Sequence, residues 1–175
     1  MSNSCWKHQL RMILNEKTKR IAVVGVGHEL RGDDAAGIHV IHELQDNLLP
    51  TDTFLLIEAG SAPENLTGQL RRFAPHTVLL IDAVDMGQPS GMIQYVDLED
   101  KIIESVSSTH ALSLRLFATY IKTEFNCDVH LMGIQAEQMT LDTPLSASVQ
   151  SSTDHIIQSF LASAWFQKNS SLYEQ

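Results

Sequence analysis

Cysteine is scarce in this chain of 175 residues, which contains only Cys5 and Cys127, far apart in the sequence. A disulfide framework and a thiolate zinc site each need several closely spaced cysteines, so neither is expected. Basic residues are also few: 12 Lys and Arg face 21 Asp and Glu, which gives a formal net charge of −9. Because nucleic-acid binding relies on clustered Lys and Arg, no nucleic-acid partner is expected.

Long apolar runs are missing as well. No stretch approaches the roughly 20 apolar residues that cross a bilayer, and the basic N-terminal segment lacks the continuous apolar core of a secretory signal. We therefore expect a cytoplasmic protein with no membrane partner. The sequence also has no Gly-x-Ser-x-Gly elbow and no cysteine with a neighbouring base, so an ordinary serine or thiol hydrolase is not expected.

The length and composition of the chain fit one globular domain. We expect an amphipathic extension at residues 1–19, a single α/β domain at 20–166 and a polar tail at 167–175. In the extension three apolar residues recur at helical spacing, namely Trp6, Leu10 and Ile13. One apolar stripe favours a helix that packs on its own domain over a helix that docks a partner.

Short apolar runs alternate with amphipathic segments, a pattern typical of parallel α/β proteins. Strands are expected at 21–26, 53–58, 77–82, 92–98 and 128–133, and helices at about 34–48, 62–73, 110–125 and from 143 onward. The fourth strand should run antiparallel to the third, because the segment between them is too short for a crossover helix. The predicted fold is an α/β three-layer sandwich: a mostly parallel twisted sheet with one antiparallel strand and helices on both faces.

Residues that commonly cap helices stand at each expected helix start. They are Asp33 or Asp34 for the first helix, Ser61 with Glu64 for the second, Thr109 for the third and Thr143 before Pro144 for the last. One carboxylate is enough for a cap. The second of the paired acids is therefore the one that indicates a role other than capping.

The turn after the first strand carries Gly25 and Gly27, which invites a dinucleotide-binding interpretation. The fingerprint G-x-G-x-x-G, however, needs glycine where this chain has Leu30, and two carboxylates beside a pyrophosphate would repel it. A nucleotide-binding or nucleoside-binding α/β enzyme therefore stays only a minor alternative.

Polar residues fall at the carboxyl ends of several expected strands, where open parallel sheets form their sites. They are Asp34, Glu58, Asp82 with nearby Asp85, and His110 at the head of a helix. Two carboxylates and an imidazole from separate strands suit a divalent transition metal, and the positive end of a helix keeps an imidazole neutral and able to bind metal. Taken singly, Asp82 could cap a turn and His110 could be a surface residue.

Other histidines carry less information. His39 and His42 lie one helical turn apart, and His28 precedes Glu29, but none of them completes H-E-x-x-H. We expect these side chains to face solvent.

Five blocks of the sequence, in order and spacing, resemble the hydrogenase maturation endopeptidases. The blocks are Gly25–Gly37, Glu58–Asn65, Leu80–Gly87, Ser108–His110 and Gly133–Gln135. The resemblance covers roughly residues 20–165. Composition and periodicity alone do not indicate this activity.

The resemblance implies an endopeptidase that removes a C-terminal extension from the precursor of a nickel-iron hydrogenase large subunit after nickel insertion. It maps the family's metal ligands and catalytic residues onto Asp34, Asp82 and His110. It also implies that nickel is carried by the precursor and recognised there, with no permanently bound cofactor. The expected partner is that precursor, and the protein is expected to be a monomer.

Two positions depart from the family pattern. The first block usually has asparagine where this chain has His28, and glycine where it has Ala35. His28 could add a ligand or replace a turn asparagine. The alternative from another functional class is a noncatalytic, nickel-dependent chaperone that binds the precursor.

Overall fold

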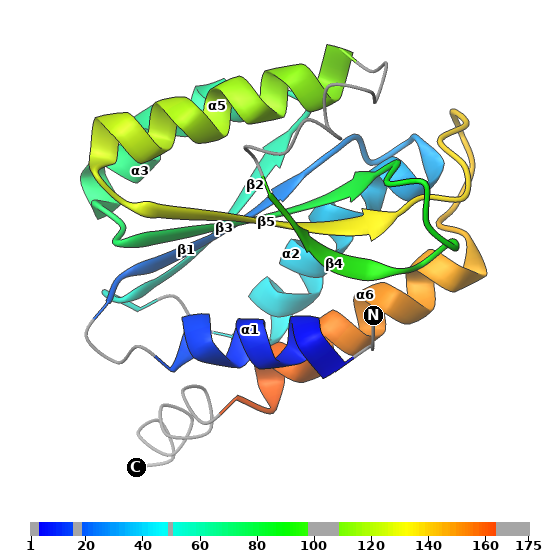
Figure 1. Cartoon of the computed structure of the whole chain (residues 1–175), viewed down its shortest axis with the longest axis horizontal. Coiled ribbons are helices and arrows are strands. Elements are labelled where there is room, and N and C mark those ends of the chain that lie inside the picture. The colour runs from blue at the N-terminus through cyan, green and yellow to red at the C-terminus, as the bar shows by residue number, and fades with distance from the viewer. Residues whose placement is uncertain (1–3, 16–18, 49–50, 98–108, 164–175) are drawn as a thin grey trace.

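A computed structural model describes residues 4–15, 19–48, 51–97 and 109–163. Five strands form one sheet in the order β2-β1-β3-β5-β4, with β4 antiparallel at one edge and the rest parallel (Figure 1). The strands are β1 (Ile21–Val26), β2 (Phe54–Gly60), β3 (Thr77–Val84), β4 (Ile93–Val96) and β5 (Asp128–Gln135). This is the predicted fold class, and all five expected strands are present.

Helices cover both faces of the sheet. They are α1 (Ser4–Leu14), α2 (Ala36–Asn47), α3 (Thr67–Phe73), α5 (Thr109–Phe125) and α6 (Ala147–Leu161), with short 3-10 helices η1 (Gly32–Ala35) and η2 (Pro63–Leu66). One buried cluster joins the sheet to α1, α2 and α6, and a second joins its other face to α3 and α5 (Figure 1). None of the helices within the described ranges is long and apolar enough to cross a membrane.

Successive residues of each central strand point to opposite faces. In β3, Leu79 and Ile81 belong to the cluster between the sheet and helices α1, α2 and α6. Val78 and Leu80 belong to the cluster on the other face, between the sheet and helices α3 and α5. Both faces are apolar because both are covered, as in other parallel sheets. The direction of each polar side chain near a strand end follows from this alternation.

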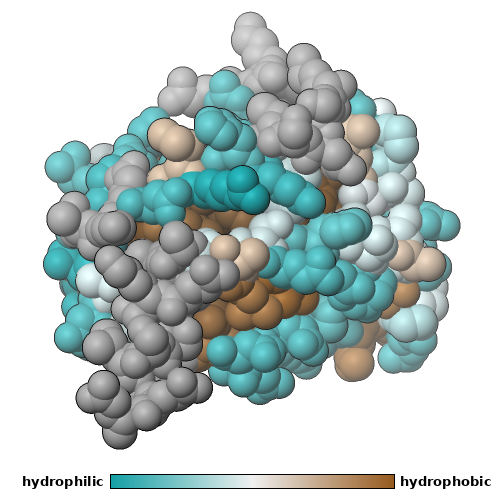
Figure 2. All heavy atoms as spheres, turned by 90° about the horizontal axis from the view of Figure 1, so that it is seen from below, coloured by the Kyte–Doolittle hydropathy of each residue, from teal (hydrophilic) through white to brown (hydrophobic). Residues whose placement is uncertain are grey.

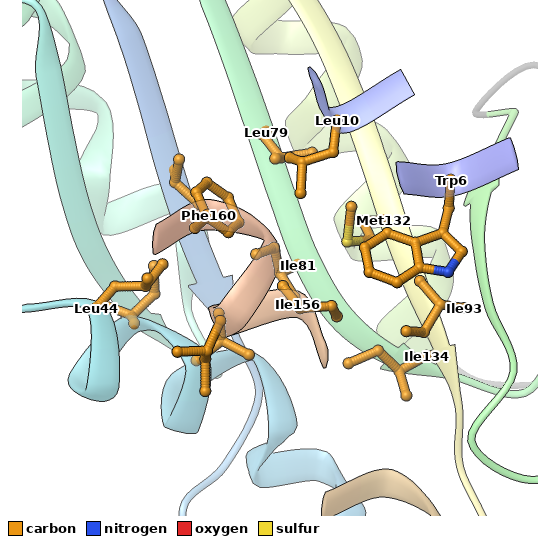
Figure 3. Packing of buried hydrophobic residues seen from close by; sticks show 14 of the residues in the cluster. Trp6, Leu10, Leu44, Leu79, Ile81, Ile93, Met132, Ile134, Ile156 and Phe160 are labelled. Carbon is orange, nitrogen blue, oxygen red and sulfur yellow. The ribbon is translucent and has the colours of Figure 1, made fainter. Parts of the chain in front are cut away.

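The N-terminal helix packs on its own domain, as its apolar stripe predicted. Trp6 and Leu10 are 3% and 1% exposed, and Figure 3 shows the Trp6 ring near Ile93 and Met132. Figure 2 shows the molecule from below, with hydrophobic side chains near the middle of the view and hydrophilic ones around them. Helix α1 therefore covers apolar sheet surface toward the β4 edge.

The direction of β4 is confirmed, since it runs antiparallel to β3. Its neighbour in the sheet is β5, which lies between β4 and β3, and the sequence did not indicate this pairing. After β3 the chain turns outward, and Gly91 and Met92 exchange backbone hydrogen bonds with Gln135. The later strand then fills the place next to β3, because a crossover through α5 returns it parallel.

The predicted caps were wrong at three helices. In the described residues, no side-chain cap bond is present at η1, α2, η2 or α3, so the paired acids and Ser61 with Glu64 do not cap. The last helix begins at Ala147 with Ser146 as its cap, whose Oγ accepts a hydrogen bond from the Val149 amide at 3.4 Å. Thr143 instead donates its hydroxyl to the Thr140 carbonyl at 2.7 Å within the preceding loop.

Candidate functional site

Helix α2 begins in direct contact with the backbone of two strands. A Cβ atom on Gly37 would lie 2.2 Å from the Ile81 carbonyl oxygen and 2.5 Å from that of Val26. Only glycine permits this approach, because the atoms it would meet are backbone atoms. The contact places η1, which leads into α2, against the carboxyl end of β3.

The loop between β1 and α2 is closed by its own backbone. Gly27 has φ +133°, and a Cβ there would lie 1.7 Å from the Asp34 carbonyl oxygen. The same oxygen accepts a hydrogen bond from the His28 amide at 3.2 Å, and the Arg31 amide donates to the His28 carbonyl at 3.1 Å. Asp34 is therefore fixed beside the end of β1, with 5% of its surface exposed.

The other acid of the pair has a structural role. The Asp33 carboxylate is fully buried and accepts hydrogen bonds from the amides of Glu137, Gln138 and Ser146 at 2.7 to 2.9 Å, and from the Ser146 hydroxyl at 3.0 Å. Its own amide donates to the Gln138 carbonyl at 2.9 Å. Asp33 thus joins η1 to the loop between β5 and α6 and leaves Asp34 as the acid available for chemistry.

Asp82 lies at the carboxyl end of β3 and is 1% exposed. Strand alternation puts it on the same face as Val78 and Leu80, under α3 and α5. Figure 1 shows α5 beginning on the side of the sheet where β3 and β5 end. The position of Asp82 is therefore the one expected for a residue that faces the start of α5.

The helix α5 begins at Thr109, one residue earlier than predicted. The side chains of Thr109 and His110 lie outside the described part of the structure, so the predicted cap and the predicted ligand both stay predictions. The backbone of His110 is in the first turn of α5.

Glu58 does not join Asp82, contrary to the grouping expected from the sequence. In β2 it lies on the same face as Leu56 and points toward α2, whereas Asp82 points toward α3 and α5. His42 of α2 meets it, with Nε2 2.8 Å from Glu58 Oε2. His42 was expected to face solvent, and its side chain is 44% exposed, but its contact with Glu58 was not expected. Its pairing depends on how α2 lies across β2, for which a single sequence carries no signal.

Asp85 stabilises a turn instead of the site. Its Oδ1 accepts hydrogen bonds from the Gly87 amide at 3.1 Å and from Gln135 Nε2 at 3.2 Å, and these bonds lower the pKa of the Asp85 carboxyl. Gln135 Oε1 accepts from the amides of Met86 and Gln88 at 2.7 and 3.1 Å. Gln135, which the sequence placed only in the last block of the resemblance, therefore shapes the loop after β3.

The ring of His28 takes the turn role that was one of its two open interpretations. Its Nδ1 accepts a hydrogen bond from the Leu30 amide, two residues on, at 3.2 Å. An asparagine side chain makes the same kind of bond in an Asx turn. His28 can therefore replace a turn asparagine at this position.

A substitution at His28 tests this role. Asparagine should be tolerated with a change in unfolding free energy below about 0.5 kcal/mol, because its side-chain oxygen can accept the Leu30 bond. Alanine should cost about 1 kcal/mol, the usual net value of one hydrogen bond. Urea denaturation of both variants measures the difference, and equal stability of the two would contradict the assignment.

Together, two buried carboxylates from separate segments lie at the carboxyl edge formed by β1 and β3, namely Asp34 and Asp82. Buried carboxylates are costly unless they are protonated, hydrogen-bonded or paired with a cation. Carboxylate oxygens and a neighbouring imidazole form a ligand set that suits a divalent transition metal. The described part of the site therefore supplies carboxylate oxygens at the carboxyl edge of the sheet.

Comparison with known proteins identifies the family. A family model described as HycI: Hydrogenase maturation protease matches residues 38–163. The Escherichia coli K12 protein named Hydrogenase 3 maturation protease is 28% identical over 133 residues, which cover 76% of this chain and 83% of that protein. A Methanocaldococcus jannaschii protein with a hydrogenase maturation protease name is 31% identical over 149 residues, 82% of this chain and 87% of that protein.

The solved structures agree. The crystal structure of a NiFe hydrogenase maturation protease, HycI from Thermococcus kodakarensis KOD1, superposes with a TM-score of 0.78 at 30% identity, covering 91% of this chain and 99% of that one. The family match spans well over half of the sequence, and the fold agrees over nearly all of it. The chain therefore belongs to the hydrogenase maturation proteases, a family of peptidases.

Proposed function

We propose that this protein removes the C-terminal extension from the precursor of a nickel-iron hydrogenase large subunit after nickel insertion, and that it recognises the bound nickel. The observation that carries the proposal is the pair of buried aspartates, Asp34 and Asp82, at one edge of a sheet with the hydrogenase maturation protease fold. The Thermococcus kodakarensis relative is named as a NiFe hydrogenase protease, which supports the substrate class.

In this proposal Asp34, Asp82 and His110 contact the nickel that the precursor carries. Two carboxylates and a neutral imidazole provide oxygen and nitrogen donors for this ion. Their contact positions the scissile bond beside the metal, which is worth several kcal/mol of barrier because the reacting groups are already oriented. Water polarised by the metal, or water assisted by a carboxylate, then attacks the peptide carbonyl. The enzyme needs no permanently bound cofactor for this reaction.

The partner in this proposal is the precursor of the large subunit, and the protein acts as a monomer in the cytoplasm. The oligomeric state is tested by light scattering of the purified chain, and the location by fractionation of cells that express it.

The decisive experiment is a cleavage assay. Nickel-loaded and nickel-free precursors are each mixed with the protein, and the products are read by intact mass. Loss of a C-terminal peptide from the nickel-loaded precursor alone is the expected result. Stable binding of a precursor that is known to be competent, without any change in its mass, would instead favour the noncatalytic chaperone.

Substitutions assign the roles of the site residues. Asp34→Asn and His110→Ala should each lower the cleavage rate at least about 100-fold, because each removes a group that acts at the reacting centre. The midpoint temperature of thermal unfolding should change little in either variant. Matched controls are Asp46→Asn on the exposed side of α2 and His155→Ala on the exposed side of α6, which should cleave at the wild-type rate. A His110→Ala protein that cleaves normally would remove His110 from the site.

A further inference from the structure

Three potential metal ligands meet on the α2 side of the sheet. Glu29 comes from the loop after β1, His42 from the middle of α2 and Glu58 from β2. His42 Nε2 lies 2.8 Å from Glu58 Oε2 and 3.9 Å from Glu29 Oε1, and the three donor atoms all lie within 4.8 Å of one another. One nitrogen and two carboxylate oxygens therefore converge from three separate segments.

This cluster is separate from the residues proposed to contact nickel. Glu58 points toward α2, whereas Asp82 lies on the opposite face of the sheet, under α3 and α5. The cluster shares no residue with Asp34, Asp82 and His110. Its chemistry does not depend on the proposed cleavage reaction.

The three donors stand on well-fixed backbone. The Glu29 loop is closed by the hydrogen bond from the His28 amide to the Asp34 carbonyl and by the bond from the Leu30 amide to the His28 ring. The helix that carries His42 is fixed against β1 and β3 at Gly37. Glu58 pairs in register with Gly25 of β1. Because the backbone of these three segments is already fixed, few side-chain or loop conformations have to be ordered when an ion binds.

A simple ion pair accounts for only part of the arrangement. The contact of His42 with Glu58 is a normal hydrogen bond, and it needs no second carboxylate. Glu29 nevertheless approaches the same nitrogen. Ligand atoms about 2.1 Å from a tetrahedral ion lie roughly 3.4 Å apart, a spacing that falls between the two observed separations of 2.8 and 3.9 Å.

We propose that Glu29, His42 and Glu58 form a binding site for a divalent transition-metal ion of the Zn²⁺ type. Imidazole nitrogen and carboxylate oxygen are ordinary ligands of this ion, and three protein ligands leave a fourth position for water. The side chains of His42, Glu29 and Glu58 are 44%, 58% and 42% exposed, so an ion can enter from solvent. A pocket of about 280 Å³, lined by Glu29 and His42 among others, adjoins the site and gives room for that water.

A bound ion would join the Glu29 loop to α2 and β2. The same loop leads to Asp34, so the ion would also stabilise the segment that positions this acid. Binding to the folded state alone raises the unfolding temperature. The site therefore predicts a stability readout that is independent of peptidase activity.

The test uses tag-free protein with Asp34→Asn and His110→Ala, which removes two of the residues proposed to contact nickel. Calorimetric titration with Zn²⁺ should show one ion bound per chain. Adding His42→Gln or Glu58→Gln should weaken binding at least about tenfold, because each removes one of three ligands. Zn²⁺ at about ten times Kd should raise Tm by about 3–6 °C in the double variant, and this rise should be lost with His42→Gln.

The matched control is His39→Gln, one turn earlier on α2. His39 lines the same pocket, but its Nε2 contacts Gln150 at 3.1 Å instead of a carboxylate. Its replacement should change Zn²⁺ affinity less than about twofold, because no ligand is lost. The proposal is overturned if His42→Gln and Glu58→Gln both retain the affinity of the double variant, or if His39→Gln weakens binding as much as His42→Gln. Neither result bears on the cleavage assay.

Discussion

Replacing Asp33 by alanine should lower the free energy of unfolding by about 4 kcal/mol, because three backbone amides lose their acceptor and each unsatisfied buried donor costs about 1–3 kcal/mol. The amides belong to Glu137, Gln138 and Ser146, and the Ser146 hydroxyl loses the same partner. Asp33→Asn should cost less, since one side-chain oxygen still accepts. Urea denaturation measures both, with the midpoint expected to shift at constant m-value.

Two neighbours serve as controls for this prediction. Asp46→Ala changes an exposed acid of α2 and should alter stability by less than about 0.5 kcal/mol. Asp34→Asn changes the adjacent acid and should leave folding nearly intact while cleavage is lost. A stability loss below about 1 kcal/mol for Asp33→Ala would mean that the loop can replace these bonds with water.

Gly37→Ala should destabilise the protein by about 3 kcal/mol or more, the upper range for overpacking, even though alanine is the better helix former. The new methyl carbon would lie 2.2 Å from the Ile81 carbonyl oxygen and 2.5 Å from that of Val26, both backbone atoms that belong to the sheet. Helix α2 must therefore move away from β1 and β3. Since η1 precedes α2 directly, Asp34 should shift with it and cleavage should also fall.

The chain offers a matched glycine for comparison. A Cβ on Gly68 of α3 would approach only Arg72 Nη1, at 3.9 Å. Gly68→Ala should therefore stabilise the protein by about 0.5–1 kcal/mol through helix propensity. The contrast in sign between the two substitutions isolates the contact at Gly37. Thermal and urea unfolding of both variants check it, and a stabilising effect at Gly37 would contradict the close approach.

Strand positions were the part of the fold most accessible from the sequence. The run Ile21–Val26 coincides with β1, because a strand covered on both faces is apolar at every position. Because such a strand is apolar at every position, its sequence does not show to which face of the sheet a polar residue at its end points. Glu58 and Asp82 both close apolar runs, yet they point to opposite faces of the sheet. An uninterrupted apolar run carries no alternation from which these directions follow.

The caps were mispredicted for a related reason. Capping rules treat a side chain as a partner of its own helix start. Asp33 and Thr143 instead bond elsewhere: the Asp33 carboxylate binds amides more than one hundred residues away, and Thr143 bonds within its own loop. The pairing of His42 with Glu58 escaped prediction because it depends on tertiary packing. The position of Asp34 and Asp82 at the carboxyl ends of β1 and β3 needed only the strand boundaries, and their joint role in a site stays a prediction.

The hydrogen bonds to the Asp33 carboxylate also determine when the loop around Asp34 can be completed during synthesis. They join positions 104, 105 and 113 residues apart. At about 5–20 residues per second, the ribosome releases β1, η1 and α2 well before residues 137–146 exist. Until then the Asp33 carboxylate stays hydrated, and the loop around Asp34 has its own backbone hydrogen bonds but lacks those to residues 137–146. Incomplete copies of the chain therefore lack the finished loop, however well their first half has folded.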